Sequence, residues 1–192
     1  MNKIDIFTTP LYHCNIEQTR PLIPELESRI YEVEKTSKSV VKSNAGGFQS
    51  DYMNQDDEPA YNKLLTILKP EIIKVVNDWY FTGSNIQVGY CWYNINRKGH
   101  FNWSHSHPDG EFACVFYVKC NNESDIVFDN PDQIRTWKGH IHDKYTPYTT
   151  PGYNYSPKTN DFLMFPAHIL HKVEVNNSDE DRLSLSFNLA IS

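Results

Sequence analysis

The sequence has no long apolar segment and no recognisable leader. A helix that crosses a bilayer needs roughly 18 or more consecutive apolar residues, and no run approaches that length in the chain. The opening residues MNKIDIFTTP lack the basic-then-apolar design of a secretory signal peptide. We therefore expect a soluble cytoplasmic protein that makes no membrane contact.

Positive charge is also scarce. The chain has 18 Lys and Arg residues against 24 Asp and Glu residues, which gives a formal net charge of -6. A protein that binds nucleic acid usually carries a basic stripe or patch, and the sequence shows none. Nucleic acid is therefore not expected as a partner.

Closely spaced cysteines are missing as well. The four cysteines are scattered and form no CxxC pair, whereas disulfide scaffolds and thiolate zinc sites need close, repeated spacing. Cys114 lies inside an apolar run and is expected to be buried as a small hydrophobic residue. These observations argue against a cysteine-based site.

The length of 192 residues fits one domain that spans residues 1–192. Residues 1–80 are expected to form a helical N-terminal part. Apolar residues recur at helical spacing over 22–33, with Pro21 or Pro24 suited to the first turn, and again over 60–80. In the second stretch Pro70 predicts a kink or two abutting helices. The intervening segment 43–51 has the composition of a loop.

Residues 81–192 have a β character. Strands are predicted at 86–95, 112–118, 125–128, 162–165, 172–175 and 182–190. Helices followed by many short strands predict an α+β, mainly β fold, such as a barrel buttressed by helices.

Residues 130–160 are rich in Pro, Gly, Tyr and Thr and show no period. A loop of this length inside a compact domain is usually functional, so we expect an insertion that acts as a lid. Aromatic side chains that could pack on a substrate there are Trp137, Tyr145, Tyr148, Tyr153 and Tyr155.

Histidine placement carries the strongest chemical pattern. His105 and His107 are two residues apart, and on an extended chain such residues point to the same side. Two imidazoles plus one further ligand, with open positions left over, form a pattern typical of iron(II) chemistry. His171 is the best third candidate, because it follows an apolar strand that a β-fold can bring beside His107.

Other ligand sets remain open at this point. His107 and Asp109 could form a His-x-carboxylate pair instead of the H-x-H pair. His168 competes with His171, because Pro166 suggests a turn and either imidazole could face inward. A second H-x-H pair, His140-Ile-His142, lies in the Tyr-rich segment, where fixed ligand geometry is less expected.

The last predicted strand alternates polar and apolar residues. Its polar positions are Arg182, Ser184, Ser186 and Asn188. Such a strand can simply be half exposed, or its polar face can line a pocket. In a pocket, the planar guanidinium of Arg182 could bind a carboxylate through two hydrogen bonds, and Ser184 could add another. Arg182 follows His171 by 11 residues, and we expect it on the strand adjacent to that of His171.

These residues fall into four motifs that follow one another in order. The motifs are Phe101-Asn-Trp-Ser-His105-Ser-His107-Pro, Ala113-Cys-Val-Phe-Tyr117-Val, Asp161-Phe-Leu-Met-Phe165-Pro166 continuing to His171, and Arg182-Leu-Ser184-Leu-Ser186-Phe-Asn188. Over about residues 86–190 the chain resembles a family of 2-oxoglutarate/iron(II) oxygenases of marine bacteria and their phages. The pattern of that family is N-x-x-H-x-H-P, S-G-V-Y-Y, F-P-x-x-x-x-H and R-x-S-x-S-F-N. Four motifs in order are far more specific than one H-x-H pair.

The resemblance implies a double-stranded β-helix, or jelly roll, that binds Fe(II), 2-oxoglutarate and O2 and hydroxylates a substrate. It also implies the roles of individual residues. The metal ligands would be His105, His107 and His171, and the co-substrate would be held by Arg182 and Ser184, with help from Tyr117 and with Asn102 lining the site. If the chain is phage-encoded, the expected location is the host cytoplasm.

The sequence departs from common patterns at two places. Ala113-Cys114 stands where the family has Ser-Gly, and these residues are small too, so we expect similar packing. His107 stands where most oxygenases of this chemistry carry a carboxylate ligand. Three neutral imidazoles leave the site more positive than two imidazoles and a carboxylate.

Two other functional classes use the same fold. A cupin-like metal protein, such as an isomerase or a dioxygenase without a co-substrate, would need the histidines but not Arg182. A catalytically silent binding module would need neither metal nor co-substrate. The expected partner is a small-molecule or peptidyl substrate, and the sequence defines neither its identity nor the oligomeric state.

Overall fold

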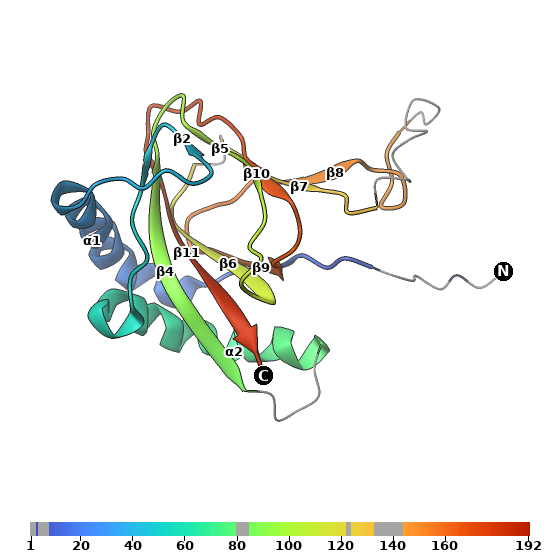
Figure 1. Ribbon diagram of the computed structural model, residues 1–192, viewed down its shortest axis with the longest axis horizontal. Coiled ribbons are helices and arrows are strands. Elements are labelled where there is room, and N and C mark those ends of the chain that lie inside the picture. Colours follow the sequence, from blue (N-terminus) through green and yellow to red (C-terminus); the bar gives the residue numbers. More distant parts are fainter. Residues whose placement is uncertain (1–2, 4–7, 80–84, 122–123, 133–143) are drawn as a thin grey trace.

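The computed structural model describes residues 3, 8–79, 85–121, 124–132 and 144–192. These residues form two antiparallel β-sheets, with two α-helices that cover one face of the larger sheet (Figure 1). Trp137, His140 and His142 of the sequence analysis lie outside the described residues. The mainly β fold with N-terminal helices is the predicted fold class.

Each sheet mixes strands from distant parts of the chain, as a jelly roll requires. The six-stranded sheet has the order β1 (Tyr12–Asn15), β9 (Asp161–Pro166), β6 (Phe112–Lys119), β11 (Arg182–Ile191), β4 (Ile86–Asn96) and β3 (Phe48–Gln49). The five-stranded sheet has the order β2 (Asn44–Ala45), β5 (Phe101–His105), β10 (His171–Val173), β7 (Ile126–Asp129) and β8 (Gly152–Tyr155).

The two predicted helical stretches are helices. After a short 3-10 turn (Glu17–Leu22), α1 spans Ile23–Thr36, with Pro24 in its first turn. After a second 3-10 turn (Gln55–Asp57), α2 spans Pro59–Trp79 as one helix that runs through Pro70. The alternative of two abutting helices is therefore wrong. Apolar residues before and after Pro70 are buried in the same core, and this packing stabilises the helix on both sides of the proline: Leu64, Leu68, Ile72, Val75 and Val76. No described helix is long and apolar enough to cross a membrane.

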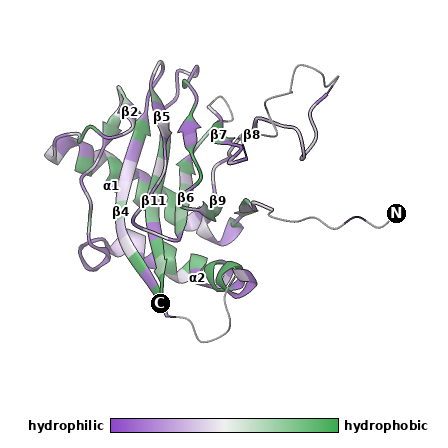
Figure 2. Ribbon diagram, turned by 45° about the vertical axis from the view of Figure 1, so that its right-hand side comes forward, coloured by the Kyte–Doolittle hydropathy of each residue, from purple (hydrophilic) through white to green (hydrophobic). Residues whose placement is uncertain are grey.

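Strand β6 is buried on both faces, which explains why its sequence is apolar without interruption. Phe112, Cys114, Phe116 and Val118 join the core beneath the helices, and Ala113, Val115 and Tyr117 join a second core between the sheets. A strand buried on both faces reads as a continuous apolar run. Figure 2 shows hydrophobic stretches, in green, along strands of the six-stranded sheet and along the helices that cover it. All four cysteines are free, and Cys114 is buried as expected.

Strand β11 is amphipathic in the way that its sequence predicts. Its apolar positions pack under the helices at 0% exposure, namely Leu183, Leu185, Phe187 and Leu189. Its polar positions 182, 184 and 186 line a cavity between the sheets. The pocket-lining interpretation therefore describes this strand better than the half-exposed one.

The segment 43–51 is not only a loop. It contains β2 and β3, which join different sheets and are separated by Gly46 and Gly47 at φ 70° and 68°. A Cβ atom on Gly47 would lie 2.5 Å from the Ile95 carbonyl oxygen, so glycine is required by both conformation and space. The segment crosses from one sheet to the other at the edge of the cavity.

Residues 130–160 also contain a strand, although their composition does not indicate one. Strand β8 pairs antiparallel with β7 at the edge of the five-stranded sheet. Strands β1 and β5 were not predicted either. Strand β1 is only four residues long, and β5 carries the polar and aromatic residues of the first histidine motif.

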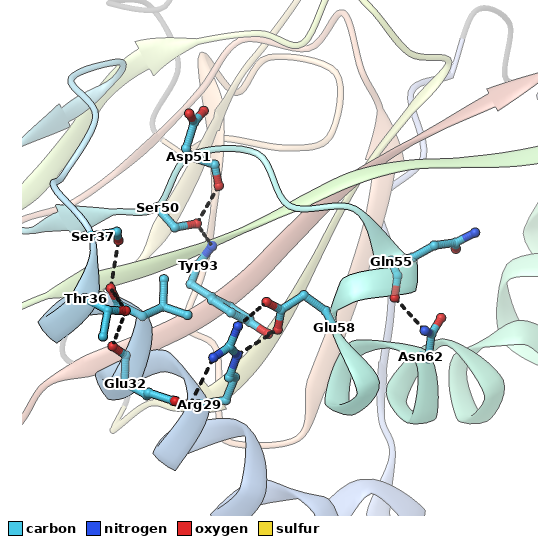
Figure 3. Close-up of polar contacts among 11 residues, drawn as sticks. Arg29, Glu32, Thr36, Ser37, Ser50, Asp51, Gln55, Glu58, Asn62 and Tyr93 are labelled. Carbon is cyan, nitrogen blue, oxygen red and sulfur yellow. Dashed lines mark hydrogen bonds and ion pairs between the residues drawn. The ribbon is translucent and has the colours of Figure 1, made fainter.

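A buried carboxylate joins the first helix to the sheet. Glu58 is 2% exposed and accepts hydrogen bonds from Arg29 Nη2 at 2.6 Å, Arg29 Nε at 3.0 Å and the Tyr93 hydroxyl at 3.0 Å (Figure 3). Arg29 lies on α1, Glu58 just before α2 and Tyr93 on β4. These contacts compensate the carboxylate for its loss of water.

Replacing Arg29 by alanine is expected to lower the free energy of unfolding by about 1–3 kcal/mol, because a buried carboxylate loses two of its donors. Chemical denaturation measures the change. The matched control is Arg20→Ala, which removes an ion pair to Glu17 whose side chains are 69% and 64% exposed and should cost less than about 1 kcal/mol. Equal losses in the two variants would show that the Glu58 contacts add no particular stability.

Candidate active site

Three histidines converge inside the cavity between the sheets. His105 ends β5, His171 begins β10, and the two residues are direct partners across these neighbouring strands. His107 follows β5 by two residues. The candidate ligand atoms of the three side chains all lie within 4.8 Å of one another. A cation placed among them would be reached by all three imidazoles.

Backbone carbonyls orient two of the imidazoles. Nδ1 of His171 lies 2.9 Å from the Ile169 oxygen, and Nδ1 of His105 lies 2.7 Å from the Trp103 oxygen. A carbonyl can only accept, so in both contacts Nδ1 carries the hydrogen and Nε2 keeps its lone pair. This arrangement is the one that fixes histidine ligands in metal sites.

Burial also sets the charge of these side chains. Loss of water lowers the pKa of His105, and it lowers the pKa of His107 to about 4 and that of His171 to about 3. Each of the last two values is lowered further by a neighbouring histidine. The imidazoles are therefore neutral at pH 7, which is the form that binds a metal ion.

The cavity has a volume of about 380 Å³ and takes residues from both sheets. We call it the central cavity. Its polar wall is formed by Ser43, Gln49, Asn94, Asn102, Tyr117, Arg182, Ser184 and Ser186, in addition to the histidines. Its apolar wall includes Val115, Ile126, Phe165 and Val173. A concave space with a few convergent polar groups is the usual form of a small-molecule site.

Arg182 lies in the central cavity, but not on the strand expected for it. It begins β11 in the six-stranded sheet, whereas His171 begins β10 in the five-stranded sheet. The expectation of adjacent strands is therefore wrong. The residues between His171 and Arg182 carry the chain from one sheet to the other, so the two side chains reach the cavity from different sheets.

The Arg182 guanidinium is buried without a full set of partners. The residue is 3% exposed, and Nη1 makes one long hydrogen bond to Asn96 Oδ1 at 3.4 Å. Nε has no hydrogen-bond partner, and no carboxylate of the described residues pairs with the side chain. The Tyr117 ring lies beneath the guanidinium, with 4.9 Å between the Arg182 carbon and the ring centroid. A buried cation in this state is costly and favours an anion beside it.

Tyr117 and Asn102 also line the central cavity. Tyr117 is fully buried, its hydroxyl has no partner among the described residues, and burial raises its pKa, so the hydroxyl stays protonated. Asn102 accepts a hydrogen bond from Asn96 Nδ2 at 3.0 Å and donates one to Ser43 Oγ at 3.1 Å. Asn102 thus joins the polar wall near Arg182 to Ser43, whose hydroxyl lies 3.4 Å from His105 Nε2.

The competing ligand candidates lie elsewhere. Asp109 and His168 are exposed on turns, and neither lines the central cavity. Tyr145, Tyr148 and Tyr153 line a second, larger hollow, which shares Phe165 with the central cavity. Tyr155 contacts His13 and Asp161 instead.

Several cavity residues were missed by the sequence analysis. Trp92 and Asn94 line the cavity and lie opposite Ser186 and Ser184 on the neighbouring strand β4. Their alternation with Cys91, Tyr93 and Ile95 is the same pattern that singled out β11, so this pattern could have revealed them. Gln49 lies in β3 and Ser43 lies directly before β2, and no periodicity predicts either of these two-residue strands.

Two antiparallel sheets that enclose three convergent imidazoles define a double-stranded β-helix protein with a candidate metal site. The comparison with protein families then gives the identity at family level. The family model described as "Putative 2OG-Fe(II) oxygenase" matches residues 90–188, just over half of the chain. The chain belongs to this family of 2-oxoglutarate/iron(II) oxygenases. No curated protein matches the sequence.

Solved structures show the same fold at low sequence identity. A prolyl-4-hydroxylase from Pseudomonas putida has a TM-score of 0.67 at 13% identity, with 95% of this chain and 93% of that chain covered. The α-ketoglutarate-dependent epimerase SnoN from nogalamycin biosynthesis has 0.67 at 14% identity, with 95% and 78% covered. HygX from Streptomyces hygroscopicus, with nickel and 2-oxoglutarate bound, has 0.64 at 10% identity, with 95% and 83% covered.

Proposed function

We propose that this oxygenase holds Fe(II) with His105, His107 and His171, anchors 2-oxoglutarate with Arg182, and hydroxylates its substrate. The observation that carries the proposal is the pairing of two features in one cavity. Three neutral imidazoles converge in the cavity, and a buried guanidinium with no carboxylate partner among the described residues lines the same cavity. A dicarboxylate that chelates a metal at one end and pairs with arginine at the other fits both features.

The three imidazoles would bind the metal from one side and leave its other positions open. When bound, the iron would supply the redox chemistry that couples decarboxylation of 2-oxoglutarate by dioxygen to oxidation of a C–H bond. The carbonyls of Trp103 and Ile169 hold two of the ligands in the tautomer that presents Nε2. The protein thereby sets the ligand geometry before the metal arrives.

The polar wall that includes Arg182 would bind the distal carboxylate of the co-substrate. The guanidinium of Arg182 supplies a planar fork, and its Nε is free to donate. The Tyr117 hydroxyl is a second unused donor beside it, and Ser184 lines the same wall. Apolar side chains such as Phe165 and Val173 line the same cavity, and charged contacts are stronger beside apolar groups than in bulk water.

Hydroxylation is the outcome proposed for the substrate. The prolyl-4-hydroxylase of similar fold supports it, although the similar epimerase SnoN performs another reaction. Incubation with Fe(II), 2-oxoglutarate and a candidate substrate under 18O-labelled dioxygen tests the proposal. One labelled oxygen atom in the product, together with succinate, is the expected result, and an unlabelled or isomerised product would contradict hydroxylation.

The cupin-like alternative uses the same histidines but assigns no task to Arg182. A calorimetric titration of 2-oxoglutarate into the protein separates the two. We expect binding with manganese(II) present and at least tenfold weaker binding without it. Binding that is the same with and without metal would favour a silent binding module, and no binding in either state would favour the cupin-like alternative.

The ligand set is tested by a pair of variants. His105→Ala is expected to lose manganese(II) binding, because it removes a ligand whose tautomer is fixed by Trp103. Asp109→Asn is expected to keep it, because Asp109 is exposed on a turn. Titration followed by electron paramagnetic resonance measures both. Metal loss in Asp109→Asn with binding retained in His105→Ala would reverse the assignment.

A further inference from the structure

One basic and three aromatic side chains lie at the mouth of the central cavity. Lys42, Tyr52, Trp92 and Trp103 line the cavity, and we call these four residues the rim. Tyr52 is 55% exposed and Trp103 is 63% exposed, so large flat surfaces face solvent beside the opening. Exposed aromatic side chains grouped at a cavity usually mark a binding surface.

Two aromatic rings of the rim form a continuous series of contacts with His107 in the candidate metal site. Tyr52 packs edge-on against Trp92 with 5.6 Å between ring centroids, and Trp92 packs against His107 with 5.5 Å. Trp92 itself is 7% exposed. Trp103 lies on β5, in the other sheet, and is supported by Phe101 at 4.7 Å. A flat molecule entering the cavity therefore meets aromatic surface from both sheets.

The charged side chains that line the cavity have one sign. Lys42 and Arg182 are the charged residues that line it, and no carboxylate does so among the described residues, although the whole chain carries a formal net charge of -6. Two acidic residues lie close by. Asp129 accepts a hydrogen bond from Ser104 at 3.2 Å, and Asp51 is exposed beside Tyr52. A cleft lined by one sign of charge attracts ligands of the opposite sign.

The proposed co-substrate does not account for Lys42. Its two carboxylates are matched by the metal and by Arg182. The volume of about 380 Å³ is near the lower limit of small-molecule sites, roughly 300–1,000 Å³. Once the co-substrate fills part of that space, a second molecule can insert only its reacting end. The rest of it must lie against the rim.

We propose, resting on the function proposed above, that the substrate is a small molecule with a negatively charged group on a flat apolar body. Lys42 pairs with the negative group, and Tyr52, Trp92 and Trp103 contact the flat body. The anion can be a carboxylate or a phosphate, since an ammonium binds either as a point charge.

The experiment uses the full chain loaded with manganese(II) and 2-oxoglutarate. The probes are phenylacetate, phenyl phosphate, the neutral phenylacetamide and the cationic phenethylamine. Bound manganese(II) broadens the NMR signals of any probe that sits near it, so the readout needs no turnover. We expect the two anions to bind about tenfold more tightly than the amide, and the cation to bind most weakly. The stronger of the two anions identifies the class.

Two variants separate charge from stacking. Lys42→Gln should remove the preference for anions, while Lys38→Gln, an exposed lysine outside the cavity, should keep it. Trp103→Leu should weaken all four probes. Equal binding of phenylacetate and phenylacetamide to the wild type would overturn the proposal. So would a Lys42→Gln variant that loses 2-oxoglutarate instead, because Lys42 would then serve the co-substrate. Failure of the wild type to bind 2-oxoglutarate at all, seen before any probe is added, would overturn the proposed function as well.

Discussion

His171→Ala is expected to weaken manganese(II) binding by more than about 100-fold, which is the upper end of the loss seen for residues that only support a metal ligand. His171 is the most buried of the three histidines at 4% exposure, and the Ile169 carbonyl fixes its tautomer. It also faces His105 directly across the ladder between β5 and β10. Removing it leaves two imidazoles, which hold a metal ion far less tightly than three.

The matched control for this experiment is His168→Ala. His168 is three residues away, but it is exposed on the turn after β9, so its loss should change the affinity by less than about twofold. Calorimetry with manganese(II) measures both variants. A comparable loss in His168→Ala together with retained binding in His171→Ala would show that the ligand comes from the turn.

Arg182→Ala is expected to lower the affinity for 2-oxoglutarate by roughly 30- to several-thousand-fold. The range corresponds to about 2–5 kcal/mol, the usual cost of truncating one partner of a buried charged pair. The side chain is 3% exposed and has no internal carboxylate among the described residues. The co-substrate would be the partner that makes this burial favourable. The measurement is a titration of 2-oxoglutarate with manganese(II) present, which prevents turnover.

Arg182→Lys provides the matched comparison, because it keeps the positive charge and removes the planar pair of N–H donors of the guanidinium. It should recover only part of the affinity, since an ammonium cannot make two parallel hydrogen bonds to one carboxylate. Metal affinity should be nearly the same in both variants, which separates loss of the co-substrate from loss of the metal. Equal 2-oxoglutarate affinity in the wild type and both variants would remove Arg182 from the proposed site.

Much of the fold was predictable because long elements carry a clear period. Helices α1 and α2 follow their apolar stripes, and β11 follows its alternation of polar and apolar residues. The double-sided burial of β6 is the reason for its unbroken apolar run. In each case the pattern extends over enough residues to be distinguished from chance.

Short elements could not be predicted from their own residues. Strands β2 and β3 have two residues each, which is too short for any period, and their pairing is decided by the strands beside them. Strand β8 contains Gly152 and lies in a segment rich in turn-forming residues, so its composition indicates a loop. Its pairing with β7 along four residues overrides that local tendency.

The residues of the candidate site also fall into those that the sequence indicates and those that it does not. His105, His107 and Arg182 could be proposed from the sequence because residue type and spacing limit what such side chains can do. The sheet that carries Arg182 was predicted incorrectly, because sequence separation gives the length of a connection but not its destination. Ser43 and Lys42 could not have been found, since nothing in a loop-like segment indicates which cavity it borders.

The position of Arg182 on a different sheet from His105 and His171 has a mechanical consequence. His105 and His171 lie on the five-stranded sheet and Arg182 lies on the six-stranded sheet, so a molecule held at both ends would tie one layer to the other. The unfolded chain cannot bind the molecule at both ends. At a concentration 100 times its dissociation constant, the molecule would therefore add about 2.7 kcal/mol to the free energy of unfolding. The added stability should slow hydrogen exchange in both layers at once, in β10 and in β11, rather than around a single loop. Metal alone should protect only the first of these layers.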